Sequence, residues 1–226
     1  MQRKVLDKQR ARSSVHKAAR RAQLLAAAGQ LLAEQPYEQV TLAAVARAAG
    51  LSKGSAYTYF PTKESLFLAL LTERLESWRD GLIARLPGRR RSPRTLARLI
   101  AESFAADRTL RDLLARLHTA LEINVPDEEI RAFKWFLASL VSALAIQVDR
   151  TCPGLEPGQA QHLFLLVHSL VIGLGVACTE LPNVTAALAE QPALKQAFEL
   201  DFTTELAHVI ELIVRGWLAE NAAGTP

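Results

Sequence analysis

The chain has 226 residues, half of them hydrophobic, and a formal net charge of +4 at pH 7. This length and composition suit one large domain, or a small and a larger one, and they exclude a disordered chain. The two cysteines, Cys152 and Cys178, form no CxxC pair and lie near no ligand-spaced histidine, so we expect reduced, buried thiols and neither a metal nor a cofactor.

The positive charge is concentrated at the N-terminal end. Residues 1–63 contain eleven Lys or Arg and three Asp or Glu, so this segment carries +8 and the remainder −4. Such a basic block indicates a polyanion partner; a merely solvated basic tail is the alternative. The N-terminus lacks the apolar region of a signal peptide, and the apolar run 163–178 is short for a membrane span. We therefore expect a cytoplasmic protein with no membrane partner.

A basic arm and a first helix open the predicted chain. We expect residues 1–14 to be flexible because they lack apolar periodicity. Apolar residues at three- and four-residue spacings then predict a helix from about residue 15, which Pro36 ends. Thr41 is suited to cap a second helix, and Gly50 is placed just beyond its end, where a left-handed conformation is needed.

A short third helix is predicted over about 53–59, with Ser52 as its N-cap and Pro61 after its end. A tight turn joins it to the helix before, so residues 15–61 read as a helix-turn-helix domain. A longer connecting helix follows over 62–85.

The loop LPGRRRSPR at 86–94 is the best domain boundary. Its arginines belong to a solvated loop or face DNA from the domain junction. Beyond it only helical patterns occur, at roughly 94–106, 109–124, 127–150, 157–180 and 197–220. No β-type alternation of useful length is present, so we predict an all-α fold of about nine helices, with a larger helical domain over 86–226.

The third helix has the composition of a recognition helix, the element that enters the DNA major groove. Small residues at its start allow close approach, lysine and hydroxyl groups suit phosphates and base edges, and no acid stands between Glu38 and Glu64. The residues that this reasoning assigns to DNA are Ser52, Lys53, Gly54, Ser55, Tyr57, Thr58, Tyr59 and Lys63. The basic residues from Arg3 to Arg21 follow the DNA backbone, enter a minor groove, or form an exposed tail.

The stretch from Leu24 to Phe67 resembles the DNA-binding region of the TetR family of bacterial transcriptional regulators. The matching features include Tyr37 near the first loop, Ala49-Gly50-Leu51-Ser52, the Tyr59-Phe60 pair and Lys63-Glu64. The resemblance implies a homodimer whose C-terminal helical domain binds a small molecule and controls operator affinity. It places DNA contacts on Thr41, Lys53, Ser55, Tyr57, Tyr59 and Lys63. Repression of transcription is the common mode of regulation in this family.

Two C-terminal helices have patterns typical of self-association. Small residues recur every four positions on one helix, and an apolar stripe runs along the last helix. In the family such helices form a four-helix dimer interface; in the alternative, the stripes are simply intrachain core. The candidate interface residues are Ser169, Gly173, Ala177, Phe202, Leu206, Val209, Ile210, Ile213 and Trp217.

Polar or aromatic side chains within the middle helices are candidates for contact with the ligand: Phe104, His118, Glu122, Trp135, Phe136, His162 and His168. His118 and Glu122 are four apart, so they pair with each other or meet a polar ligand group. The abundance of Leu, Ala and Val predicts a largely apolar effector. A regulator without a ligand, or one switched by a protein, is the alternative. We expect no enzyme, because HExxH, GxSxG and Gly-rich phosphate-loop motifs are absent from the sequence.

Overall fold

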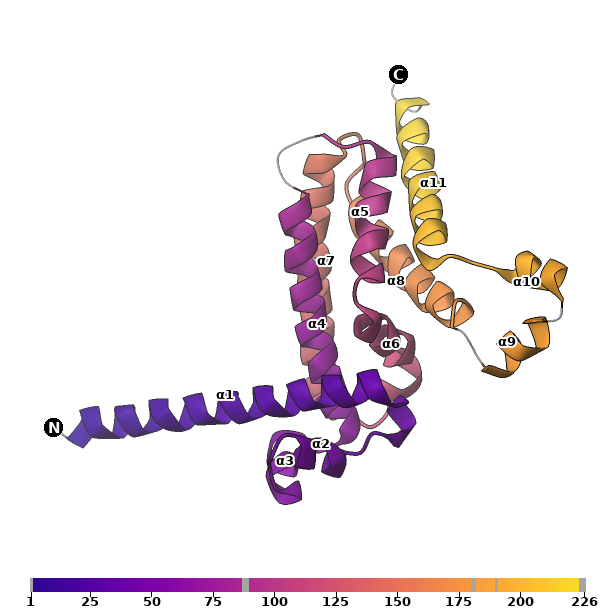
Figure 1. The fold of residues 1–226 in the computed structure, drawn as a ribbon. Coiled ribbons are helices and arrows are strands. Elements are labelled where there is room, and N and C mark those ends of the chain that lie inside the picture. The colour runs from indigo at the N-terminus through magenta and orange to yellow at the C-terminus, as the bar shows by residue number, and fades with distance from the viewer. Residues whose placement is uncertain (1, 87–89, 180–181, 190, 224–226) are drawn as a thin grey trace. The chain divides into compact units, whose positions relative to one another are not determined.

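A computed structural model describes residues 2–86, 90–179, 182–189 and 191–223 of the chain. Within these ranges the structure contains eleven α-helices and no β-strand (Figure 1), which confirms the all-α prediction and exceeds the expected nine helices. The helices are α1 (Gln2–Glu34), α2 (Leu42–Ala48), α3 (Lys53–Tyr59), α4 (Lys63–Arg85), α5 (Pro93–Ala105), α6 (Arg108–Arg116), α7 (Asp127–Thr151), α8 (Gln159–Ala177), α9 (Pro182–Ala189), α10 (Pro192–Phe198) and α11 (Phe202–Ala223).

Helix α1 begins at Gln2, so the structure makes residues 2–14 helical where the sequence predicts a flexible arm. The physical reason is local: this segment is rich in Lys, Arg and Gln, which favour helix, and the first glycine of the chain is Gly29. Helix α1 ends at Glu34, two residues before Pro36, as expected.

The described chain divides into two compact units. The first contains residues up to Thr72 together with His118–Ile130, and the second contains Glu73–Leu117 and the chain from Arg131 onward. Helix α4 therefore begins in the first unit and continues into the second. The core of the first unit includes the fully buried side chains of Leu24, Val45 and Phe67.

In the second unit, α11 packs against α5 and α8, and α8 also packs against α6. Its core holds an aromatic cluster in which the ring of Trp78 lies 4.4 Å from that of Phe104 and 6.4 Å from that of Phe164. The indole Nε1 of Trp78 donates a hydrogen bond of 2.8 Å to Ser103 Oγ, so this buried polar group is satisfied.

Helices α7 and α8 are each long and apolar enough to span a membrane, judged by length and composition alone. Core and interface helices of soluble proteins pass the same test. In each of the two helices, only 28% of the most apolar stretch of 18 residues is buried within the chain. Both therefore present apolar surface that their own chain does not cover.

Both cysteine thiols are free. Cys152 is buried and Cys178 half-buried, and burial raises the pKa of both thiols. Protonated thiols at neutral pH fit the expectation of reduced cysteines.

Candidate nucleic-acid interface

The turn between α2 and α3 is fixed by local hydrogen bonds. Thr41 Oγ1 accepts from Ala44 N at 3.1 Å and caps α2. At the other end Gly50 has φ +68°, and Leu51 N donates to Ala46 O at 2.8 Å. A bond of this reach around a left-handed glycine is a Schellman motif. The predicted cap and the predicted left-handed glycine are therefore both present.

Helix α3 begins directly after this turn. Ser52 Oγ accepts from Ser55 N at 3.1 Å, so Ser52 caps the helix as predicted. Ala56 and Phe60 are buried and attach α3 to the core of the first unit. The opposite face is open to solvent, because Ser52, Lys53, Gly54, Tyr57 and Thr58 are exposed, and Ser55 and Tyr59 are half-buried.

Two contacts shape the exposed face of α3. Thr58 Oγ1 donates to Gly54 O at 3.1 Å, so its proton is used within the helix while its oxygen lone pairs and methyl group stay available to a base. The Lys53 ammonium lies 5.9 Å from the centre of the Tyr57 ring. Lysine and hydroxyl groups thus stand together on a surface suited to phosphates and base edges.

Lys63 differs from the other predicted contacts. It is half-buried in the first turn of α4, and its Nζ donates to Tyr37 O and lies 3.8 Å from the centre of the Tyr37 ring. That ring in turn meets Phe67 edge-on, with centroids 5.0 Å apart. The ammonium therefore stabilises the turn after α1. Because it has three donors, a phosphate contact stays a prediction alongside this structural role.

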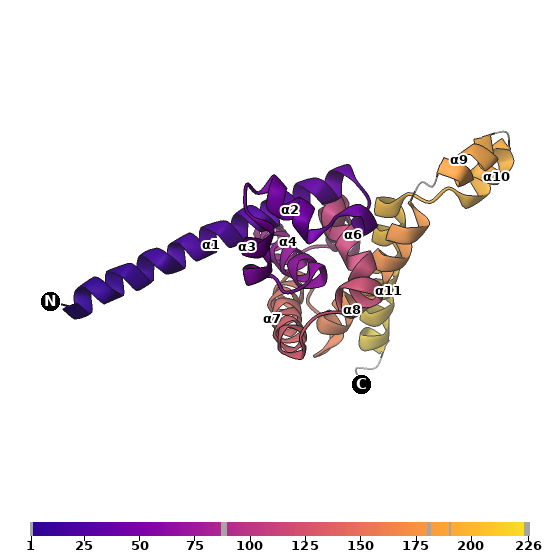
Figure 2. The same ribbon diagram turned by 90° about the horizontal axis from the view of Figure 1, so that it is seen from below.

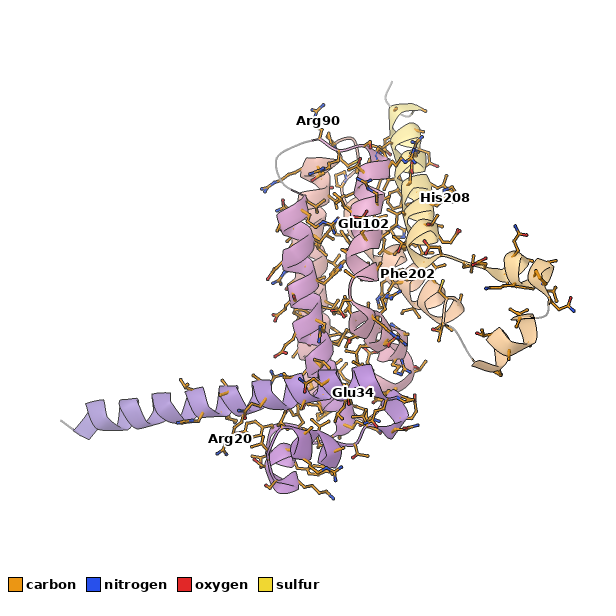
Figure 3. The ribbon with its side chains drawn as sticks, viewed as in Figure 1. Arg20, Glu34, Arg90, Glu102, Phe202 and His208 are labelled. Carbon is orange, nitrogen blue, oxygen red and sulfur yellow. The ribbon has the colours of Figure 1, made fainter. Side chains whose placement is uncertain are left out.

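The first unit has further exposed cations besides the one on α3, and one of them, Arg20, lies within the basic segment Arg3–Arg21 considered above. Arg20 is exposed on α1 (Figure 3), and Arg47 is exposed in the last turn of α2. The charge count of residues 1–63 includes both, but helical periodicity alone does not show that they are solvent-facing. They extend the positive charge of the unit beyond α3.

The seven residues predicted to line a ligand pocket are divided between the two units. Phe104 is buried in the aromatic core. His118 Nδ1 lies 3.0 Å from Glu122 Oε2, and both residues group with the first unit. The remaining four lie in the second unit with different exposures: Trp135 is 76% exposed, His162 is exposed, and Phe136 and His168 are half-buried.

The predicted dimer residues separate into an inner and an outer set. Phe202 (labelled in Figure 3), Leu206 and Ile210 are buried inside the chain, which corrects their assignment to an interface between subunits. For these three the intrachain-core alternative holds. The others are less buried: Ser169, Gly173 and Ala177 on α8 are exposed, and Val209, Ile213 and Trp217 on α11 are half-buried.

The capped turn, the exposed face of α3 and the all-α fold define the class of protein: a helix-turn-helix DNA-binding protein. The sequence model described as "Bacterial regulatory proteins, tetR family" matches residues 24–70, and one described as "Tetracyclin repressor-like, C-terminal domain" matches residues 72–221. The chain therefore belongs to the TetR family of bacterial transcriptional regulators. This is a non-enzymatic family, which confirms that the protein is not an enzyme.

Several known proteins are similar to this chain. It is 29% identical to the HTH-type transcriptional regulator BetI of Agrobacterium fabrum over 181 residues, which is 79% of this chain and 85% of that protein. It is 30% identical to BetI of Rhizobium meliloti over 135 residues, or 59% of this chain and 66% of that protein. The crystal structure of the regulator FadR from Bacillus subtilis in complex with stearoyl-CoA shares the fold, with a TM-score of 0.53, 16% identity, and 86% of this chain and 98% of that chain covered.

Proposed function

We propose that this protein is a homodimeric repressor in the bacterial cytoplasm that binds a pseudo-palindromic operator and releases it when a largely apolar small molecule binds the helical domain. The observation that carries the proposal is the solvent-facing surface of α3. It follows a capped tight turn, presents lysine, tyrosine and threonine side chains, and contains no acid. Such a surface suits the major groove.

Dimerisation is supported by the outer faces of α8 and α11. Leu165 and Val176 on α8 are 61% and 63% exposed, and Leu212 on α11 is 55% exposed. Ser169 and Gly173 lie between Leu165 and Val176 on α8, and their small size allows close approach of a partner helix. Complete burial of a large apolar side chain contributes roughly 1.5–3 kcal/mol, and because Leu165, Val176 and Leu212 are already partly covered, each would contribute roughly 1–2 kcal/mol. A two-fold dimer would place two α3 helices on two half-sites, hence a pseudo-palindromic operator.

Release by an effector is supported by the way the chain crosses between the units. Helix α4 starts four residues after α3 ends and continues from the first unit into the second. The chain returns to the first unit at Leu117–His118, within a π-helical turn at Leu117–Leu121. A ligand that shifts α4 in the second unit would change the separation of the two α3 helices, with a coupling of order 1–3 kcal/mol.

The apolar interior of the second unit supports an apolar effector. Stearoyl-CoA is the first probe because it is the ligand in the complex of the structurally similar B. subtilis FadR. We expect it, or another compound with a long apolar part, to lower operator affinity at least fivefold in fluorescence anisotropy. Unchanged affinity across a panel of apolar compounds would contradict effector release and favour a regulator without a ligand or one controlled by a protein.

The dimer is tested by sedimentation of the wild-type protein and of Leu212→Asp, with circular dichroism to confirm that the variant is folded. Wild type should sediment at twice the chain mass of 24.8 kDa, and the variant should be monomeric and bind the operator at least tenfold more weakly. A monomeric wild type with full operator affinity would overturn the proposal.

A further inference from the structure

The segment between α8 and α11 projects from the second unit as an arm. It contains α9 and α10, which pack mainly on each other. Figures 1 and 2 both show these helices standing away from α5, α8 and α11. From here on, "the arm" means residues 182–189 and 191–200, and not the basic segment at the N-terminus.

Both ends of the arm are held at its base. Cys178 Sγ, just after α8, donates to Leu200 O at 3.4 Å. Asp201 Oδ1 accepts from Thr204 N at 2.8 Å and so caps α11. The arm thus leaves and re-enters the unit at one place, while no side chain described between these ends is buried.

The arm exposes apolar side chains that need cover. Val184 is 46%, Leu194 49%, Phe198 72% and Leu200 44% exposed. Leu194 and Phe198 are four residues apart and share one face of α10. Helices of eight and seven residues are too short to be stable alone, so they depend on packing against other structure.

We propose that the arm packs on the partner subunit of the homodimer, so that each subunit clasps the other. The arm is inserted between α8 and α11, and exposed large apolar side chains occur on all three: Leu165 and Val176 on α8, four on the arm, and Leu212 on α11. Seven of the twelve exposed large hydrophobic residues in the described chain lie between positions 165 and 212. This inference rests on the proposed dimer.

The position of the arm along the chain favours a second copy over other occupants. If α8 and α11 form the interface, the base of the arm lies at the interface edge, directly beside the partner. Two-fold symmetry then makes the two arm contacts equivalent, and each buries apolar side chains that would otherwise stay in water. The apolar face of the arm would then add to the contact area that the outer faces of α8 and α11 supply.

Photo-crosslinking tests the proposal. Phe198 is replaced by the photo-reactive residue p-benzoylphenylalanine in the full chain, and Gln196, exposed on another face of α10, is replaced in a matched control. Equal amounts of ¹⁴N- and ¹⁵N-labelled protein are mixed, exchanged and irradiated. We expect cross-linked peptides of mixed isotope from position 198, at least fivefold more than from position 196. Cross-links confined to one chain would show an arm that folds onto its own subunit and would overturn the proposal.

A second measurement separates the arm from the dimer itself. Phe198→Asp should raise the dimer dissociation constant at least tenfold, whereas Gln196→Asp should change it less than twofold. A wild-type protein that is monomeric at micromolar concentration would overturn the dimer and the arm contact together. A wild-type dimer whose dissociation constant is unchanged by Phe198→Asp would overturn the arm contact and leave the dimer intact.

Discussion

Replacing Lys63 with methionine removes the ammonium but keeps a side chain of similar length. The wild-type ammonium donates to the Tyr37 carbonyl and lies over its ring. A hydrogen bond from a charged donor contributes roughly 1.5–3 kcal/mol, and a cation–π contact at a half-exposed site about 0.5–1 kcal/mol. Allowing for solvent at this half-buried position, we expect Lys63→Met to lower the free energy of unfolding by about 2 kcal/mol.

Urea denaturation followed by circular dichroism measures this loss. With an m-value of about 2 kcal/mol per molar urea, the midpoint should fall by about 1 M. Lys53→Met is the matched control because Lys53 is exposed on α3. Its free energy of unfolding should change by less than about 0.5 kcal/mol, which moves the midpoint by less than about 0.25 M. A Lys63→Met protein with the wild-type midpoint would refute the structural role of the ammonium.

Salt dependence tests the phosphate contact separately. Each phosphate neutralised contributes about 0.9 to the slope of log affinity against log salt, so a dimer that loses two Lys63 contacts should show a slope smaller by about 1.8. Lys53→Met should show a similar change if Lys53 also meets phosphate. A slope that Lys63→Met leaves unaltered would show that Lys63 holds the turn but does not contact DNA.

Three other changes have clear expected outcomes. Gly50→Ala forces a side chain into φ +68° and should cost about 1 kcal/mol in urea denaturation, whereas Gly54→Ala, inside α3 with open space around it, should be neutral or stabilising. Leu206→Ala should destabilise the fold by about 2–5 kcal/mol because Leu206 is fully buried, while Leu212→Ala should leave the monomer's stability nearly unchanged and weaken the dimer. Thr58→Ala should alter the preferred base at one operator position by on the order of 1 kcal/mol, as read by selection of bound DNA, whereas Thr58→Val keeps a methyl group and should retain any preference for thymine.

The local geometry of the helix-turn-helix was predictable from the sequence. Capping by Thr41 and Ser52 acts across three residues, and the positive φ at Gly50 is one that few residues other than glycine adopt. Interactions of such short range depend on neighbours in the chain. The identities of a few consecutive residues are therefore enough to predict the caps and the turn.

Long-range packing was less predictable. Val209 and Ile210 are adjacent apolar residues on α11, yet Ile210 is buried and Val209 half-buried. Hydrophobic periodicity does not distinguish a face that meets the chain's own core from one that meets a partner. The contact of Lys63 with Tyr37 also escaped prediction, because 26 residues separate the two positions.

Helices α9 and α10 were missed, although the sequence contains a signal for each. Pro182 and Pro192 each occupy the first helical position, where proline is favoured. The segments are short and rich in alanine, so their apolar residues recur too few times to show a helical period. Trp135 shows a different limit of the sequence. We expected it to contact a ligand, but it is 76% exposed, because packing decides whether an aromatic residue in an apolar run faces inward or outward.

Selection of bound genomic DNA fragments by the purified protein, in moderate salt, tests the central claim most directly. The account predicts a short inverted repeat with two half-sites about one helical turn, or a multiple of it, apart. Binding should fall when either half-site is altered. Weak binding that does not depend on sequence and is abolished by moderate salt would contradict the account. The basic N-terminal segment would then be a general polyanion-binding surface.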